Sequence, residues 1–251
     1  MTVSMRVLSA GDGYRYLLKS VAAGDGNRSL TEPLTRYYTE KGTPPGYWLG
    51  SGVSSLGGGR LPACGVVTED QLRLLLGLGA DPISGEPLGR PYPVYRRSTG
   101  PEGQAAKARR RAVAGFDFTF SVPKSVSVLW ALADAKTQAL IAQAHRRAIA
   151  DVIDLLERDV AVTRVGADAG DGSVAQVEVA GVIATAYDHY DSRSGDPQLH
   201  THVVVANRVR ALHDGKWRTL DGRPLHAAVV ALSEHYNAVL ADHLVASPGV
   251  V

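Results

Sequence analysis

Cysteine is almost absent from this sequence, because Cys64 is the only one among 251 residues. A single cysteine excludes an intramolecular disulfide and a Cys-x-x-Cys metal or redox site. No apolar run approaches the roughly 18 residues that cross a membrane, and the N-terminus lacks the apolar core of a signal peptide. We therefore expect a soluble, cytoplasmic protein without a membrane segment.

Net charge is also small, at +2, but its composition and distribution are uneven. Arginine supplies 21 of the 27 basic residues, and its planar guanidinium suits bidentate contact with phosphate. Residues 90–111 hold seven basic residues against one acid, whereas residues 151–196 hold ten acids against three arginines. A basic rim beside an acidic, metal-attracting region suits a polyanionic substrate, although ordinary solvated surface would have a similar composition.

Length and hydropathy patterns predict a mixed α/β protein. With 251 residues and 45% hydrophobic content, the chain can bury a large core in one domain or two small ones. Alternating or apolar runs predict strands over residues 4–9, 116–121, 174–187 and 203–205. Helical patterns begin near residue 14 and at residue 68, and extend over residues 134–160 and 225–244. Residues 213–216 read as a hairpin turn.

Three histidines lie close together in the segment from residue 187 to residue 207. His200 and His202 are two apart at the start of an apolar run, so on a strand they share one face about 7 Å apart. His189 ends the preceding strand-like run, and the loop between contains glycine and proline, which suits a connection that brings the three together. Three imidazoles on adjacent strands would hold one divalent cation with coordination positions left open. The alternative is that these histidines are exposed at a strand edge and bind no metal.

All three phenylalanines lie in the strand-like segment FDFTFS, residues 116–121. Their alternation places them on one face, which we expect to be core, and places Asp117 on the other. An unpaired carboxylate is costly to bury. Asp117 therefore either faces solvent or belongs to a site. His145, between apolar positions of the long helix, reads as a packing residue.

Tyr14 and Tyr16 follow a turn of residues 11–13, in which Asp12 can cap a short helix. Side chains two residues apart on a helix point about 200° apart, so only one of the two can face a given site. Packing is the alternative role for both tyrosines. Tyr37 and Tyr38 form a second pair.

Two long motifs of the sequence resemble those of a known family. DPQLHTHVVVAN, residues 196–207, with a further histidine at 189, is similar to the metal motif of conjugative relaxases of the MobF, or TrwC/TraI-like, type within the HUH endonuclease superfamily. FDFTFSVPKSVSVLWAL, residues 116–132, resembles the second motif of that family. LSAGDGYRYLLKSV, LTRYYTEKGTPPGYWLGSG and HYNAVLADHL also resemble family segments, so the likeness extends over nearly the whole chain.

The resemblance implies a fold and a set of functional residues. It implies a palm-like, two-layer α/β fold with a central antiparallel sheet flanked by helices. It implies one relaxase domain over residues 1–251, truncated at its C-terminal side, since the family domain usually continues into helices that clamp DNA. The positions matching the metal ligands are His189, His200 and His202, and Asp117 matches the aspartate that supports the active site.

The resemblance leaves more than one tyrosine as a candidate for the nucleophile. Many relatives keep adjacent tyrosines at this position, whereas Arg15 separates Tyr14 from Tyr16 here. Holding residues 9–11 in register with relatives places Tyr16 on the nucleophile, with Tyr14 as the alternative. Tyr37 and Tyr38 match a place where relatives often keep further tyrosines.

The resemblance also implies an activity and its partners. The expected reaction nicks single-stranded DNA at an origin of transfer, leaves a 5′-phosphotyrosine link and later rejoins the strand during conjugation. It uses one divalent ion, Mg²⁺ or Mn²⁺ in the cell, with Zn²⁺ or Ni²⁺ also suited to imidazole. Accessory relaxosome proteins and a transfer apparatus are expected partners. The candidate phosphate contacts are Lys124, Arg36, Arg109, Arg110 and Arg111.

Two other classes of function fit parts of the sequence. A three-histidine zinc hydrolase or lyase acting on a small molecule would use metal-bound water and would need no tyrosine. A DNA-binding remnant of a relaxase would bind DNA without cleaving it. A covalent tyrosine adduct on single-stranded DNA distinguishes a relaxase from the hydrolase. Metal-independent DNA binding without cleavage would support the DNA-binding remnant.

Overall fold

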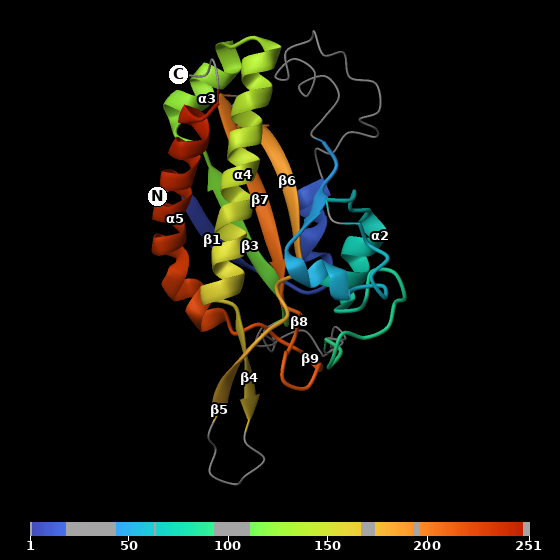
Figure 1. Ribbon diagram of the computed structural model, residues 1–251. Helices are drawn as coiled ribbons and strands as arrows, with labels where there is room; N and C mark the ends of the chain where they lie inside the picture. The colour runs from blue at the N-terminus through green and yellow to red at the C-terminus, as the bar shows by residue number, and fades with distance from the viewer. Residues whose placement is uncertain are drawn as a thin grey trace, which may run out of the picture.

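The computed structural model describes residues 2–18, 44–62, 64–92, 111–166, 174–192 and 196–247. At its centre is an antiparallel sheet of five strands in the order β1-β3-β7-β6-β2 (Figure 1). These strands are β1 (Val3–Ser9), β2 (Tyr47–Leu49), β3 (Val113–Ser121), β6 (Ala184–Asp191) and β7 (Pro197–Ala206). The expected α/β fold with a central antiparallel sheet is confirmed.

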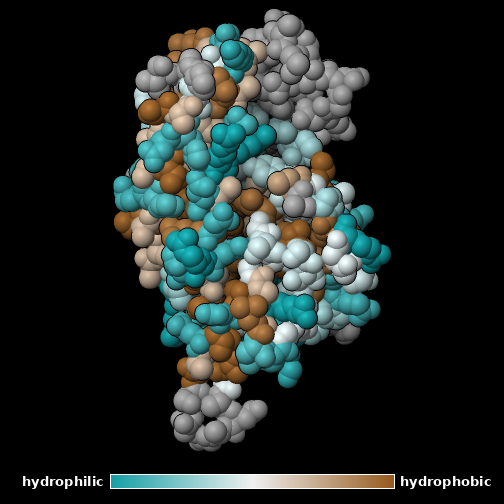
Figure 2. Space-filling view, viewed as in Figure 1, coloured by the Kyte–Doolittle hydropathy of each residue, from teal (hydrophilic) through white to brown (hydrophobic). Residues whose placement is uncertain are grey.

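Three helices, α3 (Lys124–Leu132), α4 (Ala135–Asp159) and α5 (Gly222–Val245), accompany the sheet. The long helices α4 and α5 lie across one face of it (Figure 1). Phe116, Phe118 and Phe120 point into the core beneath this layer, together with Val203 and Val205 of β7. Hydrophilic side chains gather over the outer surface of α4 (Figure 2), so this helix is amphipathic, with its apolar side towards the sheet.

The opposite face of the sheet carries a second, smaller core at one end. Short elements pack there: η1 (Asp12–Leu18), η2 (Ser51–Ser55), α2 (Glu69–Leu72) and η3 (Arg73–Leu78). Tyr14, Leu17, Trp48, Tyr187 and Val204 are buried in this cluster. Because β1 leads directly into η1, this packing fixes where the tyrosines of η1 lie relative to the sheet.

The predicted strand over residues 174–187 is wrong, because the structure divides it. Residues Val174–Glu178 form β5, which pairs with β4 (Val162–Gly166) in a separate ribbon, whereas the chain joins the main sheet only at Ala184. The break contains Gly181 at φ +81°, where an added Cβ would lie 1.8 Å from Ser51 Oγ. Only glycine tolerates both that backbone conformation and that contact.

The other element predictions hold where the structure describes them. Thr68 begins α2 with a capping box, in which its hydroxyl accepts from Gln71 N and the Gln71 side chain accepts from Thr68 N. The turn at residues 213–216 joins β8 (Val209–Arg210) to β9 (Trp217–Arg218). Residues 34–38 lie outside the described part of the chain. Among the described residues, no helix is long and apolar enough to span a bilayer.

Candidate active site

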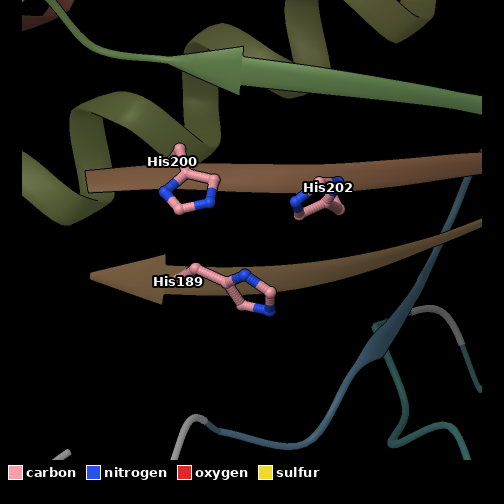
Figure 3. Close-up of side chains that lie close together, drawn as sticks. All are labelled: His189, His200 and His202. Atoms are coloured by element: carbon pink, nitrogen blue, oxygen red, sulfur yellow. The ribbon is translucent and has the colours of Figure 1, made fainter. Parts of the chain in front are cut away.

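The three predicted metal ligands meet on the face of the sheet opposite the long helices. In the β6–β7 pairing His189 lies directly across from His200, and His202 lies one pleat further along the same face of β7. Their rings cluster over the two strands (Figure 3), with centroids 5.1 to 5.4 Å apart. One ring nitrogen from each lies within 4.8 Å of the others. The strand register therefore builds the cluster that the spacing predicted.

The protonation states of these histidines suit a cation. Burial, followed by the neighbouring His200 and His202, lowers the pKa of His189 to about 4. Burial also lowers the pKa of His200. His189 Nε2 is buried and has no hydrogen-bond partner among the described residues, and a metal ion can satisfy such an unpartnered ring nitrogen. His200 Nδ1 lies 2.9 Å from the Gln198 carbonyl, so it carries the proton and leaves Nε2 as the lone-pair donor.

Asp117 orients the third histidine. Its side chain is 2% exposed, so the solvent-facing alternative for this residue is wrong. His202 Nδ1 lies 3.0 Å from Asp117 Oδ1 and therefore donates to the carboxylate, which leaves Nε2 free for an ion. A carboxylate behind a ligating imidazole fixes the ring and increases its basicity. The donor set thus fits one divalent metal ion, held by three imidazoles.

Tyr16, and not Tyr14, reaches this site. The Tyr16 hydroxyl donates a short hydrogen bond to Asp117 Oδ2, and its ring lies edge-on to His202 at 6.0 Å. Burial and then the negative charge of Asp117 raise the pKa of Tyr16 well above its ordinary value. Tyr14 is 2% exposed and packs in the smaller core. The geometric expectation that the two tyrosines face different surroundings is confirmed.

Arg6 is a further charged residue at the site, and the sequence patterns did not identify it. It lies opposite Asp117 in the β1–β3 pairing, with Nη2 3.4 Å from Asp117 Oδ2. Its guanidinium carbon lies 4.7 Å from the centroid of the Tyr16 ring. Alternation within residues 4–9 indicates the face Arg6 occupies, but not that β1 would pair with β3.

The predicted phosphate contacts are only partly placed. Lys124 is exposed at the start of α3, where its Nζ donates to the Pro197 carbonyl at 2.9 Å, beside the strand that carries the histidines. Arg111 is exposed just before β3, at the opposite end of that strand from Ser121, which pairs with His200. The structure therefore does not bring Arg111 to the histidines. Arg36, Arg109, Arg110 and the Tyr37/Tyr38 pair lie outside the described residues.

A buried polar network backs the site from the helix side of the sheet. Asp188 Oδ1 accepts from the Thr201 hydroxyl at 2.7 Å, and Asp188 Oδ2 accepts from Arg146 Nε at 2.9 Å. His145 Nε2 lies 2.9 Å from Thr201 Oγ1, and its Nδ1 lies 2.7 Å from the Tyr236 hydroxyl. Asp188 adjoins His189 in sequence, and Thr201 lies between His200 and His202. The network therefore fastens β6 and β7 together directly behind them.

Comparison with known proteins matches this chain to a family of relaxases and to a conjugation protein. A family model described as TrwC relaxase matches residues 10–250. The multifunctional conjugation protein TraI of Escherichia coli is 41% identical over 106 residues, which is 42% of this chain and 6% of TraI. The chain thus matches only a small part of that relative.

Two solved structures extend the comparison over almost the whole chain. A copper-bound structure of the conjugative relaxase TrwC in complex with oriT DNA superposes with a TM-score of 0.69 and 28% identity, over 97% of this chain and 70% of that one. A metal-bound TrwC–oriT complex gives a TM-score of 0.68 and 27% identity over the same shares.

Proposed function

We propose that this chain, which belongs to the TrwC relaxase family, is a DNA relaxase domain that nicks single-stranded DNA with Tyr16 as its nucleophile. The observation that carries this proposal is the hydrogen bond from the Tyr16 hydroxyl to Asp117, the same carboxylate that orients the metal ligand His202. A nucleophile, its proton acceptor and a cation site are thereby joined through one buried side chain.

The residues account for the covalent step. Tyr16 transfers its phenolic proton to the Asp117 carboxylate as its oxygen forms a bond to phosphorus. The bond from phosphorus to the 3′ oxygen breaks, and that oxygen takes up a proton from solvent. The products are a 5′-phosphotyrosine and a free 3′-hydroxyl. Because the phosphoryl link is kept, attack by a 3′-hydroxyl can later rejoin the strand without ATP.

His189, His200 and His202 would hold one divalent ion, and its charge would offset the negative non-bridging oxygens of the phosphodiester. We propose Mg²⁺ or Mn²⁺ as the ion used in the cell. Zn²⁺ and Ni²⁺ suit the all-imidazole donor set as well. Asp117 contributes indirectly by holding the Nδ1 proton of His202.

The proposed substrate is single-stranded DNA at an origin of transfer, since the TrwC structures hold oriT DNA. Lys124 is the described basic residue of the predicted set that lies beside the histidine-bearing strand, and it would contact a phosphate there. We place the reaction in the cytoplasm, within one domain, together with accessory relaxosome proteins and a transfer apparatus.

Labelled single-stranded oligonucleotides spanning a candidate transfer origin test this function. Incubation with Mg²⁺ or Mn²⁺ should give a shortened labelled strand and a covalent protein–DNA product on a denaturing gel, and a chelator should suppress both. Tight binding without any cleavage would support a non-catalytic DNA-binding remnant instead. Metal-dependent hydrolysis of a small ester with no DNA adduct would support a zinc hydrolase.

A further inference from the structure

Arg6, on strand β1, lies beside Tyr16, the tyrosine that we propose as the nucleophile. Its guanidinium carbon lies 4.7 Å from the centroid of the Tyr16 ring, on a side chain that is 61% exposed. The β1–β3 register puts it opposite Asp117. Arg6 therefore joins the surface at which Tyr16 would meet DNA.

The contact with Asp117 does not use up this guanidinium. The distance from Arg6 Nη2 to Asp117 Oδ2 is 3.4 Å, longer than the 2.7–2.9 Å typical of a charge-assisted hydrogen bond. Asp117 Oδ2 already accepts from the Tyr16 hydroxyl, and Oδ1 accepts from His202. Within the described part of the chain, Asp117 is also the only carboxylate that pairs with Arg6. Guanidinium has five N–H donors, so donors remain for a ligand beyond the contacts of Arg6 with Asp117 and Tyr16.

The position of Arg6 suits a phosphate in particular. A phosphorus atom attacked by Tyr16 must approach within about 3–3.5 Å of the phenolic oxygen. Its non-bridging oxygens then lie beside the guanidinium that stacks on the same ring, and a planar fork binds such oxygens well. The position of Arg6 thus lets its guanidinium bind the phosphate that Tyr16 would attack.

We propose that Arg6 is a catalytic residue of this domain, and that its guanidinium binds one non-bridging oxygen of the scissile phosphate during attack by Tyr16. This proposal rests on the proposed function of Tyr16. It assigns the stabilisation of negative charge in the transition state to two groups, the ion on the histidines and Arg6 beside the tyrosine. Arg6 forms no bond to phosphorus and transfers no proton.

Single-turnover cleavage by Arg6→Ala, Arg6→Lys and Arg15→Ala tests the role of the guanidinium. Arg15 is a matched control, because it is 64% exposed, adjoins Tyr16 in sequence and pairs with Asp12 instead. We expect Arg6→Ala to slow cleavage about 10²-fold, the scale for loss of one transition-state donor, with binding of the oligonucleotide within a few-fold. Arg6→Lys should recover part of the loss, and Arg15→Ala should stay near wild type. An equal loss of cleavage in Arg15→Ala would show that removal of any nearby positive charge slows the reaction, and it would overturn the proposal.

Methylphosphonate substrates identify the phosphate oxygen. Each of the two diastereomers at the scissile linkage replaces one non-bridging oxygen with a methyl group. On the isomer that lacks the oxygen bound by Arg6, wild type and Arg6→Ala should cleave at rates within about threefold of each other, whereas the other isomer should retain most of the difference. A full loss on both isomers would place the effect of Arg6 on Tyr16 or Asp117 alone and would contradict the proposal. Failure of wild type to form an adduct with the unmodified strand would instead remove the proposed function itself.

Discussion

Asp117 is the residue on which the site depends most. It is buried on the strand face opposite three core phenylalanines, yet its two oxygens accept from Tyr16 and from His202. An uncompensated buried carboxylate would be costly, and these hydrogen bonds offset that cost. The same contacts place Asp117 where it can act as the proton acceptor of the proposed nucleophile and as the support of a proposed metal ligand.

Asp117→Asn keeps the size of the side chain but removes its charge and its basicity. We expect cleavage to slow by about 10²-fold or more, because the proton acceptor is lost. Metal affinity should fall by about 10-fold, because the ligand His202 loses its carboxylate partner. Single-turnover cleavage and metal titration measure the two effects. Unchanged cleavage between pH 6 and 9 would show that Asp117 has no part in the reaction.

Alanine at any one of His189, His200 or His202 should greatly reduce both bound metal and cleavage. Most of the fold should remain, because the three side chains are only partly buried and β6 and β7 are fastened from the other face. Elemental analysis after dialysis, with circular dichroism for the fold, measures this. His213→Ala is a suitable control, since its side chain is 45% exposed in the β8–β9 turn. A triple alanine variant that still binds one equivalent of metal would disprove the assignment.

At the scale of elements, β6 and β7 are held from both faces. One face carries the three proposed metal ligands. The other carries the hydrogen-bonded series from Tyr236 through His145 to Thr201 and Asp188. The Thr201 hydroxyl donates to Asp188, so it accepts from His145 Nε2–H, and the Tyr236 hydroxyl donates to Nδ1. Helices α4 and α5 are thereby tied to the strands that form the site.

This series predicts a dependence of stability on pH. Burial lowers the pKa of His145 from 6.5 to about 4. Below pH 6.5 this histidine binds a proton in the unfolded chain but stays neutral in the folded one. His145 therefore lowers the free energy of unfolding by on the order of 3 kcal/mol as pH drops from about 7 towards 4. Urea unfolding across this pH range measures the free energy of unfolding, which should show no loss from His145 above pH 7.

The matched pair His145→Gln and His213→Gln identifies the residue responsible. His145→Gln should be less stable at pH 7, by about 1–3 kcal/mol for disturbed buried hydrogen bonds, but its stability should fall less steeply on acidification. His213→Gln should keep the steep dependence of the wild type. Equal slopes in His145→Gln and wild type would show that His145 is not the titrating group.

The sequence predicts which face of a strand each site residue occupies, but not which strands pair to bring these residues together. The two-residue spacing of His200 and His202 and the alternation around Asp117 are local properties of strands, so each indicates a face. The contact between Arg6 and Asp117 joins positions 111 residues apart, and local patterns carry no information about such a pairing. The break in the predicted strand at Gly181 likewise involves a distant residue, since Ser51 of η2 packs against this glycine.

At the scale of the whole molecule, the two faces of the sheet differ in what packs on them. One face packs against α4 and α5 and supplies most of the core, whereas the other holds the smaller core at one end and the histidines, Asp117 and Tyr16 nearby. Because β1 runs directly into η1, the N-terminal segment delivers the tyrosine to strands that come much later in the chain. The larger core thus lies on the helix side of the sheet, and the site lies on the opposite face.

Mapping the covalent adduct tests the central assignment most directly. The protein is trapped on a cleavable oligonucleotide and digested, and the modified peptide is identified by mass spectrometry in wild type, Tyr16→Phe and Tyr14→Phe. The adduct should lie on Tyr16 in wild type and Tyr14→Phe and be absent from Tyr16→Phe, whose DNA binding should stay within a few-fold because one hydroxyl is lost. An adduct that persists in Tyr16→Phe, on Tyr14 or on the Tyr37/Tyr38 pair, would contradict the assignment.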